Sequence, residues 1–175
     1  MSHERQAFVR SICSPRFHIS NISQGELISA LQSFIEAARV LDKVKRAIFY
    51  NKPIGQQLPL DGGAIPALNF EQVHADAFHG IIGKATEAGE LVERLLQMAD
   101  PGVDSSSHRL NLIEELGDDD WYSQLLYSFL GITQRDAQVA NERKLRKRFP
   151  EAFTSERALT RDILTEQEAL RPVPI

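Results

Sequence analysis

Four carboxylates arranged as two pairs are the residues of this sequence whose types and spacing could do chemistry. Glu87 and Glu90 form the first pair, and Glu115 and Asp118 form the second. A spacing of three residues places both members of a pair on one face of a helix. If the two helices pack antiparallel, the four carboxylates converge and repel one another unless a cation lies among them. Oxygen ligands favour a hard cation, so the pattern predicts a site for Mg²⁺ or Mn²⁺.

The same charges have a simpler interpretation as solvated side chains on surface helices, which is the usual role of a single ExxE motif. Two glycines favour a site instead. Gly89 and Gly117 lie inside the helical patterns beside the acidic pairs, where glycine costs about 1 kcal/mol relative to alanine. We expect each glycine to allow the close approach of two helices or to leave room for an ion.

A basic segment further along the chain could bind phosphate. Asn141, Lys144 and Arg148 recur at helical spacing, so one amide and two cations share a stripe. Beside a carboxylate–metal cluster this stripe favours a polyphosphate, because Mg²⁺ and basic side chains commonly share phosphate charge. Two alternatives stay open. Positive charge at the end of a helix complements the helix dipole, and residues 143–148 could form a nucleic-acid patch.

Helices must position these side chains. Start and stop signals predict helices over residues 23–49, 69–98, 108–130, 133–149 and 155–170. The segment before them lacks helical periodicity, and residues 8–13 are expected to form a short strand or an extended arm. The sequence therefore predicts an all-α fold, a bundle of four to five helices, with an N-terminal arm over 1–22 and a single domain over 23–175.

Composition limits the class of protein. A chain of 175 residues is long enough for one domain with its own core. The net charge of −4 argues against a general nucleic-acid binder, and the single cysteine, Cys13, excludes an internal disulfide framework. No apolar run reaches the about 20 residues that cross a membrane. We therefore expect a soluble, cytoplasmic protein that binds neither nucleic acid nor membrane.

Four segments, taken in order, resemble the all-α NTP pyrophosphohydrolases of the MazG-like superfamily. They are Thr-Glu-Ala-Gly-Glu-Leu at 86–91, Asn-Leu-Ile-Glu-Glu-Leu-Gly-Asp at 111–118, Trp121-Tyr122, and Asn-x-x-Lys-Leu-x-x-Arg-Phe-Pro-Glu at 141–151. The family signature is ExxE, a spacer and then ExxD, so the four carboxylates match it residue by residue. The resemblance covers roughly residues 78–152.

The resemblance implies a helical bundle of that family's type. It also implies hydrolysis of a (d)NTP to the monophosphate and pyrophosphate, with Mg²⁺ or Mn²⁺ as cofactor. Glu87, Glu90, Glu115 and Asp118 are then expected to bind the metal and to act in catalysis. One of these carboxylates, or Glu114, would serve as general base. Nucleotide-pool housekeeping is the expected role.

Under the same resemblance, Asn141, Lys144 and Arg148 contact the phosphates or sugar of the nucleotide, with Arg148 the weaker candidate. Trp121 or Tyr122 could stack on the base, although aromatic residues on a long helix usually belong to the core. Family members associate, so we expect a homodimer or homotetramer buried along the first three long helices. The alternative from another class is a non-catalytic all-α oligomeric interaction module that retains the fold, and metal-dependent release of pyrophosphate separates the two.

Overall fold

The protein is helical throughout the residues that its computed structural model describes, which are 3–14, 18–55 and 69–171. In these ranges the chain forms α1 (His3–Ser11), α2 (Gln24–Phe49), α3 (Ala75–Ala99), α4 (His108–Leu130), α5 (Gln134–Arg148), α6 (Ser155–Leu159) and α7 (Ile163–Glu168). Short 3₁₀ helices join some of them, and no strand occurs there, so the prediction of an all-α protein is confirmed. Within the same ranges, no helix combines the length and the apolar character needed to cross a membrane.

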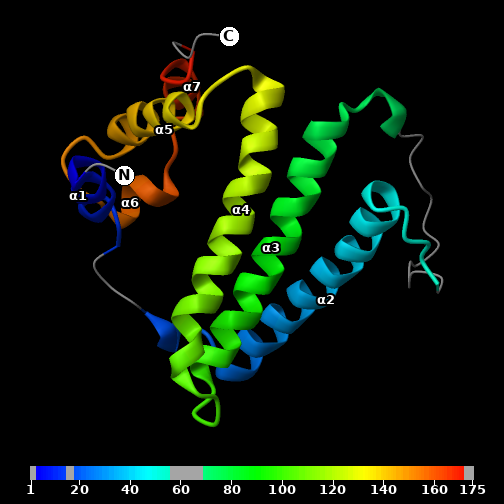
Figure 1. Cartoon of the computed structure of the whole chain (residues 1–175). Helices are drawn as coiled ribbons and strands as arrows, with labels where there is room; N and C mark the ends of the chain where they lie inside the picture. The colour runs from blue at the N-terminus through cyan, green and yellow to red at the C-terminus, as the bar shows by residue number, and fades with distance from the viewer. Residues whose placement is uncertain (1–2, 15–17, 56–68, 172–175) are drawn as a thin grey trace. The chain divides into compact units, whose positions relative to one another are not determined.

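The chain divides into two compact units, which are described separately. One unit is Ile22–Leu130, and the other combines Met1–Asn21 with Gly131–Ile175. In the first unit, α2, α3 and α4 lie side by side with α3 in the middle (Figure 1). In the second unit, α5 packs against α7. The arm over 1–22 and the single domain over 23–175 stay predictions.

The start of α2 follows directly from its sequence. The hydroxyl of Ser23 accepts a hydrogen bond from the backbone N–H of Glu26 at 3.2 Å, and the Glu26 carboxylate accepts one from the backbone N–H of Ser23 at 3.1 Å. This capping box satisfies two N–H groups at the helix end. The helix then buries a stripe of side chains that includes Ile35, Ala38 and Lys45, and this stripe sets α2 against α3.

Two glycines bring α3 close to its neighbours on either side of Glu87. A Cβ atom added at Gly89 would lie 2.2 Å from the Cβ of Ala38 on α2, and one added at Gly83 would lie 2.1 Å from the ring of Tyr122 on α4. Both contacts therefore require glycine, and the close approach expected at Gly89 is confirmed. A Cβ at Gly117 would meet no described atom within 4 Å, so Gly117 does not serve a close approach.

Two predictions of local structure were wrong, one near the N-terminus and one at the start of α3. Residues 8–13 were expected in a strand or arm, but His3–Ser11 forms α1, because residues 4–7 are good helix formers and the helix continues from them. The second long helix was expected from residue 69. Asn69 instead caps a 3₁₀ turn by accepting from the Glu71 N–H at 3.0 Å, and α3 begins after His74, whose Nδ1 accepts from the Asp76 N–H at 3.2 Å.

The predicted last helix is two short helices. Thr154 rather than Ser155 caps α6, because its hydroxyl accepts a hydrogen bond from the Arg157 N–H at 3.2 Å. Asp162 then caps α7 by accepting one from the Thr165 N–H at 3.1 Å. Aspartate is among the strongest N-cap residues, so a new helix begins where the sequence pattern predicted a continuous one.

Candidate metal centre

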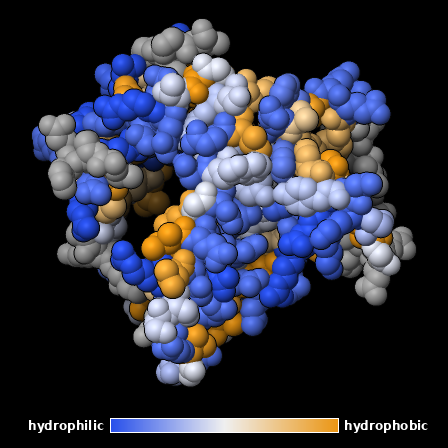
Figure 2. Space-filling model, viewed as in Figure 1, coloured by the Kyte–Doolittle hydropathy of each residue, from blue (hydrophilic) through white to orange (hydrophobic). Residues whose placement is uncertain are grey.

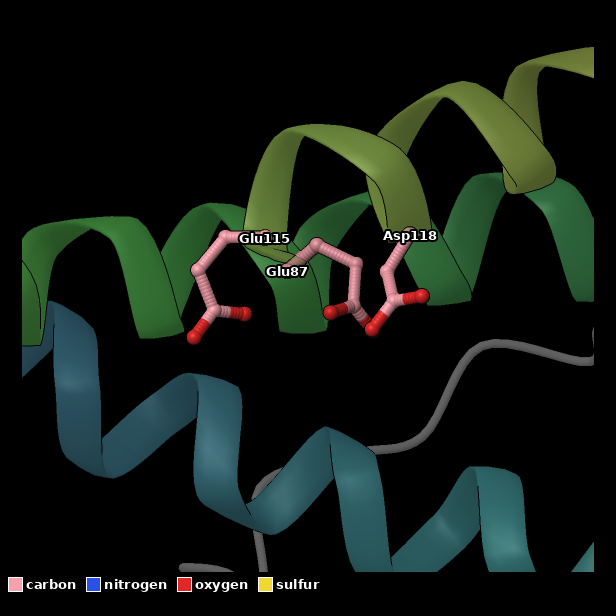
Figure 3. A group of neighbouring side chains, drawn as sticks. All are labelled: Glu87, Glu115 and Asp118. Carbon is pink, nitrogen blue, oxygen red and sulfur yellow. The ribbon is translucent and has the colours of Figure 1, made fainter. Parts of the chain in front are cut away.

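Three of the four predicted metal ligands come together between α3 and α4. One carboxylate oxygen from each of Glu87, Glu115 and Asp118 lies within 4.8 Å of the others. The three side chains project toward the side on which α2 lies (Figure 3). Glu87 is 5% exposed and Glu115 is 2% exposed, whereas Asp118 is exposed. The cluster is therefore closed off by the helices and open to solvent at Asp118.

Glu90, the fourth predicted ligand, lies beside this group and not within it. Burial, followed by the neighbouring charge of Glu115, raises the pKa of Glu90 to about 7. The charges of Glu87 and Asp42 act in the same direction. No lysine or arginine in the described part of the chain forms an ion pair with Glu90. A proton or a cation at this position would therefore relieve a real repulsion.

The spacing of the three converging carboxylates is slightly wider than a bound magnesium ion requires. Mg²⁺ binds oxygen at about 2.1 Å, so two oxygens on one ion lie at most about 4.2 Å apart. The observed separations of up to 4.8 Å close with side-chain movements below about 1 Å. All three donors are carboxylate oxygens, which suit Mg²⁺ or Mn²⁺ better than a softer metal. Glu90 is the next carboxylate available to such an ion.

A lysine that the sequence analysis missed lies against the first acidic pair. Lys45 projects from α2, and its Nζ donates to the Thr86 hydroxyl at 2.8 Å, to the Tyr122 hydroxyl at 3.0 Å and to Glu87 Oε1 at 3.4 Å. Burial by itself would lower the pKa of Lys45, but Tyr122 and Glu87 raise it on balance. A signal was present in the sequence, because Lys45 follows Ala38 by seven residues on the buried stripe of α2.

An arginine lies against the second acidic pair. Nε and Nη2 of Arg94 both donate to Glu115 Oε1, at 3.1 and 3.0 Å. Arg94 follows Glu87 by seven residues and Glu90 by four, so it shares their face of α3. The repulsion predicted for the quartet is therefore offset at Glu87 and Glu115 by the protein's own cations. It persists at Glu90.

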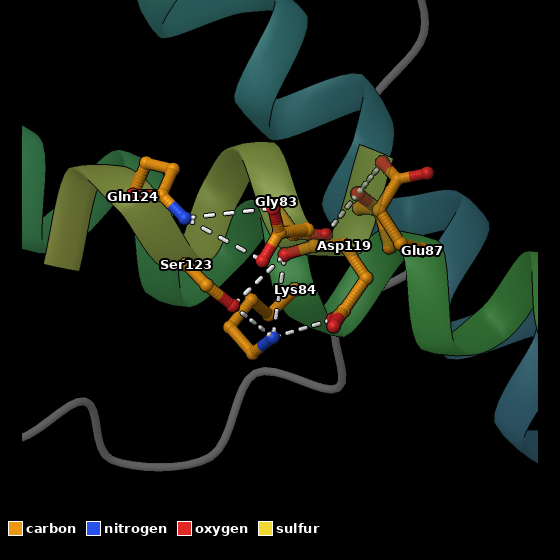
Figure 4. A network of polar contacts seen from close by, with 8 residues as sticks. Gly83, Lys84, Glu87, Asp119, Ser123 and Gln124 are labelled. Carbon is orange, nitrogen blue, oxygen red and sulfur yellow. Dashed lines mark hydrogen bonds and ion pairs between the residues drawn. The ribbon is translucent and has the colours of Figure 1, made fainter. Parts of the chain in front are cut away.

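Lys84 is the cation nearest the first pair in the sequence, yet it serves the contact between α3 and α4. Its Nζ donates to Asp119 Oδ1 at 2.5 Å and to the Ser123 hydroxyl at 2.8 Å (Figure 4). Ser123 in turn donates to the backbone carbonyl of Asp119 at 3.0 Å. This small network ties the two helices together one turn beyond the metal cluster.

The two aromatic candidates for base stacking differ in exposure. Tyr122 is 6% exposed and bonded to Lys45, so it belongs to the core of the α2–α4 unit. Trp121 is 52% exposed. Its ring lies edge-on to His79 at a centroid distance of 5.7 Å, and His79 stacks on Phe49 at 3.8 Å. Stacking on a nucleobase stays a prediction for Trp121 alone.

The basic stripe lies on α5, in the other unit. Asn141 and Lys144 are partly buried there. Arg148 donates from Nε and Nη2 to the two carboxylate oxygens of Glu166, at 2.7 and 2.5 Å, and Arg161 donates to Glu166 at 2.7 Å. These bonds lower the pKa of Glu166 to about 2. Arg148 thus joins α5 to α7 through Glu166, and this ion pair explains its positive charge without a bound nucleotide. The roles of Asn141 and Lys144 stay predictions.

Comparison with known proteins identified no relative of this chain. No model of a protein family, no curated protein and no solved structure matches this chain. The likeness to the all-α NTP pyrophosphohydrolases therefore rests on the motif segments of the sequence. The described residues establish a helical protein with packed helices α2, α3 and α4, and they assign no family.

Proposed function

We propose that this chain is a magnesium-dependent nucleoside triphosphate pyrophosphohydrolase, which converts a (d)NTP and water to the (d)NMP and pyrophosphate. The observation that carries the proposal is the convergence of Glu87, Glu115 and Asp118 from two helices, with oxygens within 4.8 Å. The four motif segments support the reaction class, because they occur in the order found in the family. A bundle of the family's type and a role in nucleotide-pool housekeeping belong to the same proposal.

The three carboxylates would bind the ion from different sides. Glu87 and Glu115 would hold Mg²⁺ or Mn²⁺ from the buried side, and Asp118 would hold it from the side that solvent and substrate can reach. When bound, the ion neutralises negative charge that develops on the phosphate oxygens in the transition state. The exposure of Asp118 gives a polyphosphate a way to approach the cluster.

Glu90 is the carboxylate best suited to accept the proton of the attacking water. A general base works best when its pKa lies near the operating pH, and burial and Glu115 raise the pKa of Glu90 to about 7. Glu114, another candidate base, is exposed to solvent on α4. We therefore assign Glu90 to proton transfer, next to the three ligands.

Assembly into a homodimer or homotetramer is part of the proposal. Leu110, Ile113 and Leu116 on α4 are 69%, 54% and 59% exposed. Hydrophobic side chains gather on the flank of α4 that faces away from α3 (Figure 2). Contiguous exposed apolar surface of this kind commonly marks an interface. Light scattering at micromolar concentration should detect an oligomer, and a monomer under these conditions would contradict this part of the proposal.

Turnover of two charge-removing variants tests the enzyme assignment. Glu115→Gln and Glu90→Gln keep the shape of each side chain, and each should lower kcat at least about 100-fold, because charge stabilisation through the metal is usually the largest catalytic contribution. Asp120→Asn is the matched control, since Asp120 is an exposed acid on α4 outside the cluster. Near-normal turnover in both glutamine variants would refute the assignment. A wild-type protein that releases no pyrophosphate would favour the non-catalytic interaction module.

A further inference from the structure

We infer that Lys45 is an internal counter-cation of the candidate metal site, which competes with the divalent ion for the charge of Glu87 and keeps the affinity for free metal low. The inference rests on the proposed function and describes how the same site is regulated. Its consequence is that the divalent ion binds tightly only together with a polyphosphate, whose negative charge outweighs the repulsion from Lys45.

Lys45 and a metal ion can share Glu87 without displacing each other. Glu87 Oε1 accepts from Lys45 Nζ at 3.4 Å and from the Thr86 hydroxyl at 3.1 Å. No donor within the described residues reaches the second carboxylate oxygen, Oε2. Glu87 contributes one carboxylate oxygen to the cluster with Glu115 and Asp118. Because no described donor bonds to Oε2, an ion can bind that oxygen while the ammonium group of Lys45 stays on Oε1.

The positive charge of Lys45 is fixed in position. Lys45 is 5% exposed, and its Nζ is held at 2.8 Å from the Thr86 hydroxyl and at 3.0 Å from the Tyr122 hydroxyl. It also lies 4.9 Å from the centroid of the Tyr122 ring. A lysine on the surface would swing into water when a divalent cation arrived. This one is confined, so its repulsion of the ion persists at a site where burial weakens screening by solvent.

The charges around the site agree with a weak affinity for free metal. Lys45 compensates Glu87, and Arg94 compensates Glu115, so two of the four carboxylates already have a cation within hydrogen-bonding distance. Asp42 on α2 adds a negative charge 3.3 Å from Lys45 Nζ, but it is itself paired with Arg46 at 2.6 Å. A divalent ion therefore meets a site that is partly neutral before the ion binds. A nucleotide polyphosphate restores the missing negative charge.

Binding of Mn²⁺ to the full chain without nucleotide tests the inference. Free Mn²⁺ would be counted by its electron paramagnetic resonance signal at pH 8, where protons compete little for the carboxylates. Lys45→Met and Lys45→Gln remove the charge, and each should lower the dissociation constant about 10- to 100-fold, as expected for losing a like charge at a partly buried site. Lys45→Arg keeps the charge, so its dissociation constant should lie closer to that of the wild type than to those of the neutral variants. Lys43→Met, the same change at an exposed position of α2, should shift the dissociation constant by less than about threefold, because solvent screens its charge.

Each outcome decides the question. Unchanged or weaker Mn²⁺ binding in both neutral variants would overturn the inference, because a lysine that only fills the core or only orients Glu87 does not repel the ion. If Lys45→Met fails to fold, Lys45→Gln carries the comparison, since its amide can still bond to Thr86 and Tyr122. The proposed function fails separately. It is contradicted by a wild-type protein that binds no Mn²⁺ at millimolar concentration and releases no pyrophosphate. A wild-type protein that binds and turns over, with neutral variants that bind no tighter, contradicts only the role of Lys45.

Discussion

Two conservative substitutions in the acidic quartet should change stability in opposite directions when no metal is present. Glu115 accepts two hydrogen bonds from Arg94, whereas the charges that act on Glu90 come from other carboxylates, namely Glu115, Glu87 and Asp42. Glutamine keeps the shape of the side chain and removes its charge. We therefore expect Glu90→Gln to stabilise the metal-free fold and Glu115→Gln to destabilise it.

The destabilisation caused by the charge of Glu90 can be estimated from its pKa, which rises from 4.5 to about 7 on folding. Each pKa unit corresponds to about 1.4 kcal/mol, which sets an upper bound of about 3 kcal/mol on the destabilisation at pH 8. Screening by solvent reduces this to about 1–2 kcal/mol. The folded state holds the proton more tightly than the unfolded state, so stability falls as the pH rises from 4.5 through 7. The gain from Glu90→Gln should therefore be full at pH 8 and only about 0.6–0.8 kcal/mol at pH 5.

Urea unfolding in the presence of a chelator measures both variants. At pH 8, Glu90→Gln should raise the free energy of unfolding by about 1–2 kcal/mol. Glu115→Gln should lower it by about 1–2 kcal/mol, because Arg94 loses a charged acceptor. A loss of stability in Glu90→Gln at pH 8, or a gain of the same size at pH 5, would refute the account of the repulsion. Equal shifts in the two variants would show that Arg94 does not compensate Glu115.

Three further predictions concern other parts of the chain. The resemblance to the pyrophosphohydrolases implies that Lys144 contacts the substrate, so Lys144→Ala should lower kcat/KM by about one to three decades, roughly 1.4 to 4 kcal/mol. Arg143→Ala, at an exposed position about 100° round the helix from Lys144, is the control and should not lower it; equal effects would leave only a solvated helix end. Gly89→Ala should lower stability by about 1–3 kcal/mol in thermal melting, because its methyl group would overlap α2; an unchanged Tm would contradict the close approach of the helices. The pKa of Glu166 falls from 4.5 to about 2 on folding, so its arginine contacts stabilise the fold above pH 4.5, and this stability is lost as the pH falls toward 2. Glu166→Gln should flatten the acid side of the Tm profile, and identical profiles would contradict the ion pairs.

Helix ends were predictable where one cap signal stood alone. Ser23 with Glu26 and Thr133 with Asp136 form capping boxes in the structure as the sequence indicated. Gly131 adopts φ = 65°, as expected for a residue that ends a helix. Errors arose where several cap residues follow one another, as between Asn69 and α3. Helix propensity and capping then favour different starting residues for the helix, and its tertiary contacts determine which start is adopted.

The acidic cluster was predictable in part, because its spacing is local. Residues three apart share a helix face, and an antiparallel return brings the faces of α3 and α4 together. The spacing argument could not predict that Lys45 lies at the site, because Lys45 reaches the site from α2. Its position depends on the register that Ala38 and Gly89 set between α2 and α3. Arg94 was within reach of the sequence, because it lies on the same face of α3 as Glu87 and Glu90.

The products of nucleotide turnover test the central claim most directly. The wild-type chain would be incubated with a panel of ribo- and deoxyribonucleoside triphosphates and Mg²⁺, and the products followed by ³¹P nuclear magnetic resonance. We predict that monophosphate and pyrophosphate appear at equal rates for at least one nucleotide, and that a chelator stops their appearance. Release of orthophosphate and a diphosphate, or no turnover of any nucleotide at millimolar Mg²⁺, would contradict the proposed reaction.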